Sequence, residues 1–160
     1  MICIRILTAL LLLGLVTACG GPGDDAEVPS AEPAGETQKD IGDHVVHFSA
    51  FTTDQLPSEI ARTYNIVRSQ DRAMLNVSVI SKEISSSVAA QVEVKTVNLT
   101  GQLKNVTMRR IDEQEAIYYI GETAVANRET LVFDITVTPE GVDRPSEIRF
   151  KREFFTDWGD

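Results

Sequence analysis

The sequence predicts an all-β domain, namely an antiparallel immunoglobulin-like sandwich of about seven strands with one short helix. A small β-barrel is the alternative. Three observations lead to this fold class. Apolar and polar residues alternate with a period of two in most segments after residue 44. These segments recur about every 10 to 14 residues, and clusters of Gly, Pro, Ser, Asn and Asp separate them.

The N-terminal segment has the make-up of a secretory signal peptide, because one basic residue, Arg5, precedes an apolar run over residues 6–16. Two small residues then precede Cys19, an order that resembles the bacterial lipoprotein cleavage motif. The resemblance implies that residues 1–18 are removed and that Cys19 becomes an acylated N-terminus. Acylation with several chains anchors a protein stably, since each buried methylene contributes about 0.8 kcal/mol. The alternative is an ordinary secretory signal with a cysteine near the cleavage point by chance.

Residues 19–41 are expected to form a disordered acidic linker between this anchor and the folded part. Acidic residues far outnumber basic ones there, and three prolines lie among Gly, Ala and Ser. Such a composition cannot bury enough apolar surface to offset its ordering entropy. A single domain is therefore expected over residues 42–160. In the bacterial lipoproteins that the N-terminal segment resembles, an aspartate directly after the cysteine favours retention in the inner membrane. This chain has Gly20 there, so the resemblance implies the periplasmic face of the outer membrane.

The first half of the folded part contains three expected strands and the helix. Period-two alternation predicts a strand over residues 44–52, and apolar residues four apart then predict a helix of about two turns over residues 56–64. A central strand is expected over residues 73–80. The next strand starts at residue 88, and its apolar positions shift by one within residues 95–98, which predicts a β-bulge there.

The second half continues the same pattern. A weaker strand is expected over residues 103–111. The strand over residues 116–125 is apolar on both faces at its start, so we expect it to be covered on both sides. Clean alternation predicts a strand over residues 131–137, and a loop over residues 139–145 leads to the last strand over residues 148–154.

Charge and cysteine content exclude several classes of function. The net charge is −9, which disfavours any general affinity for nucleic acid. Only two cysteines are present, Cys3 and Cys19. The first leaves with the signal peptide and the second carries lipid, so no disulfide, thiol nucleophile or cysteine metal site is expected.

Few residues suggest chemistry. His44 and His47 lie three apart on a predicted strand, so their side chains face opposite sides and no metal site is expected. No Gly-x-Ser-x-Gly motif is present, and we expect neither catalytic residues, enzyme activity nor a cofactor. Arg68 and Arg72 flank an exposed turn and are the candidate partner-binding residues, as a fork for a carboxylate or phosphate. In the alternative, they pair with neighbouring acids and pin the turn.

Several segments also carry a family resemblance, at residues 64–69, 72–78, 98–103, 116–120, 139–141 and 144–145. In these segments the chain resembles a family of small periplasmic lipoproteins of Gram-negative bacteria with a DUF4426-like domain of unknown function. The resemblance implies one compact β domain. It transfers no catalytic or binding residue, because no activity is assigned to the family.

Two functions fit these observations. The preferred hypothesis is a non-enzymatic accessory or protein-binding module, lipid-anchored at Cys19, that engages another protein of the cell envelope. An exposed sheet edge offers the physical route, because an extended peptide can add a strand there. The alternative is a small-molecule carrier or weak hydrolase with a pocket between the two sheets. An apolar cavity of roughly 300 Å³ or more, lined by a few convergent polar groups, would favour it, and a filled interior would not.

Overall fold

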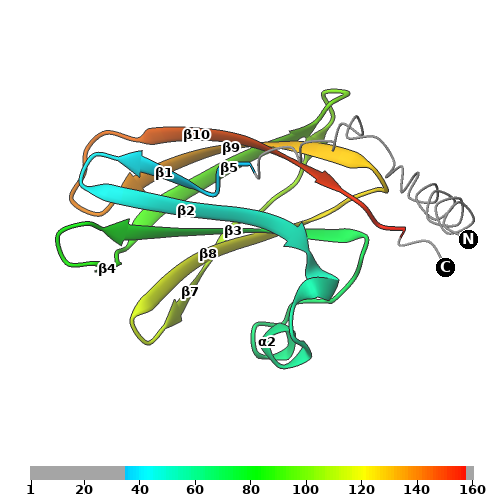
Figure 1. Ribbon diagram of the computed structural model, residues 1–160, viewed down its shortest axis with the longest axis horizontal. Coiled ribbons are helices and arrows are strands. Elements are labelled where there is room, and N and C mark those ends of the chain that lie inside the picture. Colours follow the sequence, from blue (N-terminus) through cyan, green and yellow to red (C-terminus); the bar gives the residue numbers. More distant parts are fainter. Residues whose placement is uncertain (1–34, 158–160) are drawn as a thin grey trace, which may run out of the picture. The chain divides into compact units, whose positions relative to one another are not determined.

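The computed structural model describes residues 35–157, in which ten strands and two short helical segments form one β domain (Figure 1). The strands are β1 (Gln38–Ile41), β2 (His44–Thr52), β3 (Arg72–Ser81), β4 (Ser86–Ser87), β5 (Ala90–Asn98), β6 (Leu103–Lys104), β7 (Arg109–Glu113), β8 (Ala116–Ala124), β9 (Glu129–Pro139) and β10 (Ser146–Phe154). The helical segments are the 3₁₀-turn η1 (Thr53–Gln55) and the α-helix α2 (Ser58–Thr63).

The strands form two antiparallel sheets. Sheet A has the order β1-β2-β3-β8-β7, with β4 paired to β3, and sheet B has the order β10-β9-β5-β6. Both sheets end in edge strands and neither closes on itself. The predicted antiparallel sandwich is therefore confirmed, and the barrel alternative is wrong.

The two sheets pack face to face around one core. Its centre includes Leu75 of β3 and Phe133 of β9, both almost fully buried. The ring of Phe150 lies between those of Phe48 and Phe133, with centroid distances of 4.9 Å to each. Apolar side chains thus fill the space in which the carrier hypothesis places its pocket.

The predicted β-bulge is wrong. The register of β5 against β9 runs without interruption from Ala90 opposite Pro139 to Asn98 opposite Leu131. Thr96 takes the inward position, where it is only 1 % exposed, so the faces of β5 do not exchange. The apolar residues that suggested a shift, Val97 and Leu99, instead lie on the outer face and in the turn, where Leu99 is 67 % exposed.

The strand expected over residues 103–111 is two strands in different sheets. β6 pairs with β5 in sheet B, whereas β7 pairs with β8 in sheet A, so residues 105–108 cross between the sheets. Gly121 of β8 leaves room for this crossing. A Cβ atom there would lie 2.6 Å from side-chain atoms of both Val106 and Met108.

The domain begins earlier than the expected boundary at residue 42. β1 pairs with residues 44–47 of β2 across a two-residue turn, and Lys39 Nζ donates a hydrogen bond of 2.9 Å to the Glu147 carbonyl of β10. Residues 38–41 thus belong to the sandwich rather than to the linker. The expected signal peptide over residues 1–18 and the lipidated Cys19 lie outside the described residues. Between residues 35 and 157, no helix has the length and apolar character to span a membrane.

Candidate functional site

The strands β3 and β8 carry apolar side chains on both faces, as the sequence predicts for the latter. Neighbouring residues of a strand point to opposite faces. Leu75 and Tyr119 therefore join the core between the sheets, whereas Met74 and Ile120 join a second cluster on the outer face of sheet A. That outer cluster needs a cover of its own, and α2 provides it.

The position of α2 depends on tertiary contacts, because a helix of six residues is not stable alone. Its residue Ala61 is almost fully buried in the outer cluster. The chain before and after the helix is tied together by Thr53, whose hydroxyl donates to the Val67 carbonyl (2.8 Å) and accepts from the Ser69 amide (2.9 Å). These contacts fix α2 over sheet A.

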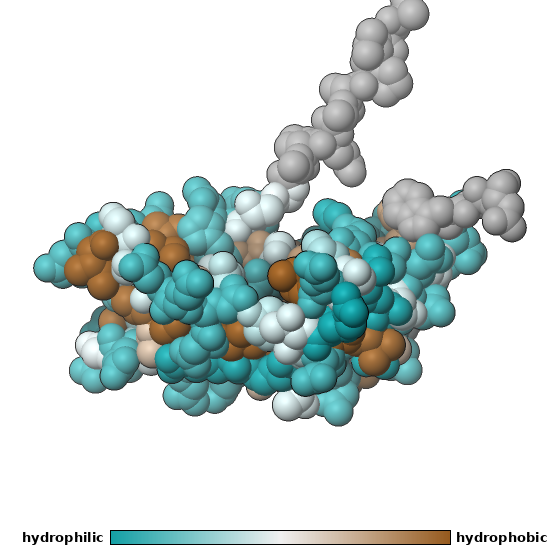
Figure 2. All heavy atoms as spheres, turned by 90° about the horizontal axis from the view of Figure 1, so that it is seen from below, coloured by the Kyte–Doolittle hydropathy of each residue, from teal (hydrophilic) through white to brown (hydrophobic). Residues whose placement is uncertain are grey.

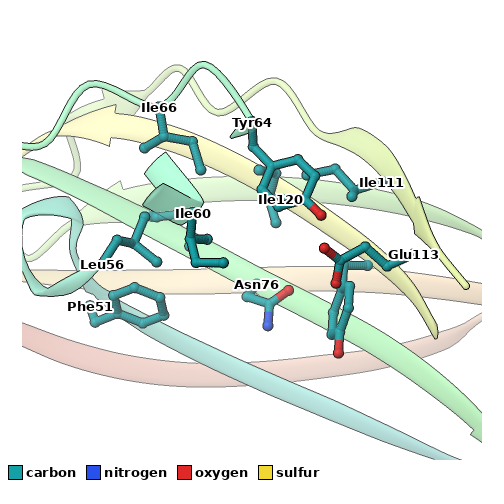
Figure 3. Close-up of a pocket in the computed structure, with 11 residues that line it drawn as sticks. Phe51, Leu56, Ile60, Tyr64, Ile66, Asn76, Ile111, Glu113 and Ile120 are labelled. Carbon is teal, nitrogen blue, oxygen red and sulfur yellow. The ribbon is translucent and has the colours of Figure 1, made fainter. Parts of the chain in front are cut away.

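A groove of about 210 Å³ remains beside α2, because so short a helix cannot cover the whole cluster (Figure 3). Its lining residues come from β2, the α2 region, β3, β7 and β8, namely Phe51, Leu56, Ile60, Tyr64, Ile66, Met74, Asn76, Ile111, Glu113, Tyr118 and Ile120. Most of these side chains are apolar, and the polar groups are the Asn76 amide, the Glu113 carboxylate and two tyrosines.

Two of the polar groups lack partners within the described chain. The Oδ1 atom of Asn76 is buried and accepts no hydrogen bond from residues 35–157. Leaving a buried acceptor unpaired costs about 1–3 kcal/mol. Glu113 forms no ion pair with any residue that the structure describes. Figure 3 shows Asn76 between Ile60 and Glu113.

The groove borders a free sheet edge. β7 is the last strand of sheet A, and within residues 35–157 its backbone makes hydrogen bonds to β8 alone. Ile111 and Glu113 lie on its groove face. Arg109 shares that face, and its guanidinium donates a 2.6 Å hydrogen bond to the Tyr64 carbonyl at the end of α2. One wall of the groove therefore has unpaired backbone groups along its outer side.

The surface around this site is mixed in character. Figure 2 views the domain from the side on which α2 and β7 lie, and hydrophobic residues reach that surface in separate areas between hydrophilic ones. Ile60, at the groove, is 42 % exposed. The site is thus an apolar opening in a polar surface.

Comparison with known proteins identifies the family. Residues 38–157 match the family described as "Domain of unknown function (DUF4426)". The chain belongs to the DUF4426 family. The crystal structure of a DUF4426 family protein from Pseudomonas aeruginosa PAO1 is similar, with 32% sequence identity and a TM-score of 0.67 over 77% of this chain and 97% of that one. A search of curated proteins finds no match. The predicted DUF4426-like domain is thus confirmed, and it includes β1.

The two candidate arginines of this DUF4426 domain contact different groups of the described chain. The Arg68 guanidinium donates to the Asp54 carbonyl of η1 (2.6 Å), and Arg72 pairs with Glu122 of β8 at 3.6 Å. Both contacts fit the alternative in which the arginines pin the local structure, although Arg68 binds a carbonyl rather than an acid. Their partner-binding role stays a prediction.

The sequence analysis did not assign a role to any groove residue of the DUF4426 domain. One signal was present, because a strand that is apolar on both faces requires two covering layers. The sequence offers one short helix for the second layer, which indicates an incomplete cover. The pattern does not show that β7 and its Glu113 border the uncovered part.

Proposed function

We propose that this DUF4426 protein is a non-enzymatic, lipid-anchored protein-binding module at the periplasmic face of the outer membrane. Its binding site is the groove on sheet A together with the free edge of β7, and its ligand is an extended segment of another envelope protein. The observation that carries the proposal is the position of an apolar groove directly beside an unpaired strand edge.

The dimensions of the site favour a protein segment over a small molecule. Sites for small molecules usually enclose about 300–1,000 Å³, and this groove is smaller, at about 210 Å³. It has room for one or two large side chains. An extended segment beside β7 would satisfy the edge through main-chain hydrogen bonds and place alternate side chains in the groove. The carrier alternative lacks this support, because the core fills the space between the sheets.

The proposed anchor would keep the site near the membrane. Eighteen residues separate Cys19 from β1, which starts at Gln38. Even a fully extended chain of this length spans only about 60 Å. A lipidated Cys19 would thus hold the start of β1 within that distance of the bilayer.

Site-specific photocrosslinking in the cell envelope tests the proposal. A photoreactive residue at Ile60, on the groove, should give a discrete protein adduct, and one at the exposed Lys151 of β10 should not. Replacing the half-buried Ile111 by lysine should remove the adduct, because it places a charge in the groove. Equal adducts from both positions, or none from Ile60, would contradict the proposal. Labelling with a clickable fatty acid, lost in Cys19→Ala, tests the anchor separately.

A further inference from the structure

We infer that the bound segment carries a large apolar residue and a lysine or arginine two residues apart, with the apolar side chain beside Ile111 at the groove and the cation at Glu113. This inference rests on the proposed function and specifies the chemistry of the partner. It follows from two features of the site, namely the spacing of two β7 residues and a carboxylate without an ion pair among residues 35–157.

The spacing comes from β7 itself. Ile111 and Glu113 lie two residues apart and share the groove face of this strand. A strand added to the free edge would place its own alternate residues opposite these two, with Cβ atoms about 4.5–5.5 Å apart. One partner residue therefore sits beside Ile111 over the groove, and the residue two positions away sits beside Glu113.

The charge at Glu113 selects a basic residue. The other charges of β7 already have partners, since Arg109 binds the Tyr64 carbonyl and Arg110 pairs with Asp112 on the opposite face. Glu113 forms no ion pair with residues 35–157. A lysine or arginine in the added strand complements this carboxylate, whereas an acidic residue there would repel it.

The groove selects the apolar residue. Ile111 is half-buried and lines the groove, whose remaining walls include Phe51 and Leu56. A large apolar side chain beside Ile111 shields this surface from water, which is favourable in proportion to the apolar area buried. Aromatic side chains bury the most area, so tryptophan is the probe.

Binding of labelled peptides to the purified full-length protein in detergent tests the inference. The probes are fluorescein-labelled Ser-Thr-Trp-Thr-Lys-Thr-Ser and its reversed sequence, because either strand direction can pair with β7. The control has the same composition with tryptophan and lysine adjacent, which places them on opposite faces of a strand. At least one spaced peptide should bind about tenfold more tightly than the control, since the control cannot bury its indole while pairing its charge.

A charge exchange tests Glu113 directly. Wild-type protein should prefer the spaced lysine peptide by about two- to fivefold over the peptide with glutamate in its place, as expected of an exposed ion pair. Glu113→Lys should reverse this preference. Glu115→Lys, at an exposed position of the adjacent turn, is the matched control and should leave it unchanged.

The apolar position is tested by exchanging tryptophan for serine in the peptide. This exchange should weaken binding to the wild type, because it removes the apolar surface that is buried beside Ile111. Equal affinities for spaced and adjacent peptides, or a preference that Glu113→Lys leaves unchanged, would overturn the inference. If the Ile60 adduct persists in that case, the inference fails alone, and if the adduct is absent, the proposed function fails with it.

Discussion

The two faces of β3 and β8 carry similar apolar residues, but the rest of the domain covers them to different extents. On the inner face, Leu75 and Tyr119 are packed against sheet B and no room remains. On the outer face, Met74 and Ile120 are packed under a six-residue helix, and a groove stays open beside them. The residue types alone do not distinguish a closed core from a face with an open groove. The extent of the covering layer makes the difference.

The two faces also differ in how their polar groups are paired. Tyr119 reaches across the sandwich, and its hydroxyl accepts a 2.7 Å hydrogen bond from the Ala90 amide of sheet B. Asn76, on the outer face, keeps a buried oxygen without a donor in the described chain. The inner face has its own exception in the Thr96 hydroxyl, which also lacks a partner there. A side-chain hydrogen bond thus ties the two sheets together on the inner face, and on the outer face a buried acceptor has no donor among residues 35–157.

The largest expected effect comes from truncating the inner face. Leu75→Ala should lower the free energy of unfolding by about 3–5 kcal/mol, because Leu75 is 1 % exposed and its neighbours in both sheets cannot collapse into the space. Urea denaturation measures the change. A loss below about 1 kcal/mol would show that the inner face is not closely packed.

The next effect concerns Glu129, which pairs with Lys104 in a polar network at the end of sheet B. Burial opposes ionisation of Glu129 and raises its pKa. Hydrogen bonds from Lys104, Asn98 and the Ala126 amide, together with the charge of Lys104, outweigh burial and lower the pKa of Glu129 below its ordinary value of 4.5. The ionised carboxylate therefore stabilises the fold above pH 4.5, and this contribution is lost as the pH falls through the lowered folded-state pKa.

Glu129→Gln should accordingly reduce the free energy of unfolding by about 1–3 kcal/mol at pH 7, because the carboxylate is only 12 % exposed and its loss leaves Lys104 without its counter-charge. Denaturation at several pH values should show the difference from wild type narrowing below pH 4.5. Glu115→Gln, at an exposed turn, serves as the control. A difference of constant size down to pH 3 would contradict the assignment.

Met74→Ala is the outer-face counterpart of Leu75→Ala, one residue away on the same strand. Met74 is 4 % exposed and lines the groove, so its truncation enlarges an existing opening rather than creating a closed cavity. We expect a loss of about 1–2 kcal/mol, near the transfer contribution alone. Equal losses for the two variants would remove the distinction between the faces.

The smallest effect is expected at the Asn76 amide. Asn76→Leu should leave the free energy of unfolding unchanged or raise it by up to about 1 kcal/mol, because it removes a buried acceptor that has no partner among residues 35–157. Thermal unfolding measures this change. A clear destabilisation would show that Asn76 is satisfied within the folded protein.

Much of the fold could be predicted from the sequence, because period-two alternation, or for β8 a run of apolar residues, locates every long strand. β1 was not predicted, since its residues Gln38–Ile41 lack that alternation and are held by backbone pairing to β2 across the turn at Gly42, where φ is 73°. The prediction of a β-bulge was wrong because a buried threonine, Thr96, continues the inward-facing side of β5.

The groove could be predicted only in part. Its walls come from segments between residues 51 and 120. A strand pattern predicts which side chains point away from the core, but it does not predict which residues they contact. The crossing at residues 105–108 decides that β7 borders β8 in sheet A rather than continuing β6 in sheet B. That crossing depends on the fit over Gly121, which no local pattern reveals.

Hydrogen exchange at the backbone amides of β7 tests the central claim most directly. The spaced peptide should slow exchange at the outward-facing amides of Arg109–Glu113, because a strand added at this edge would hydrogen-bond them, while the edge strand β10 stays unchanged. Unchanged exchange along β7 at a saturating concentration of a bound peptide would contradict the account.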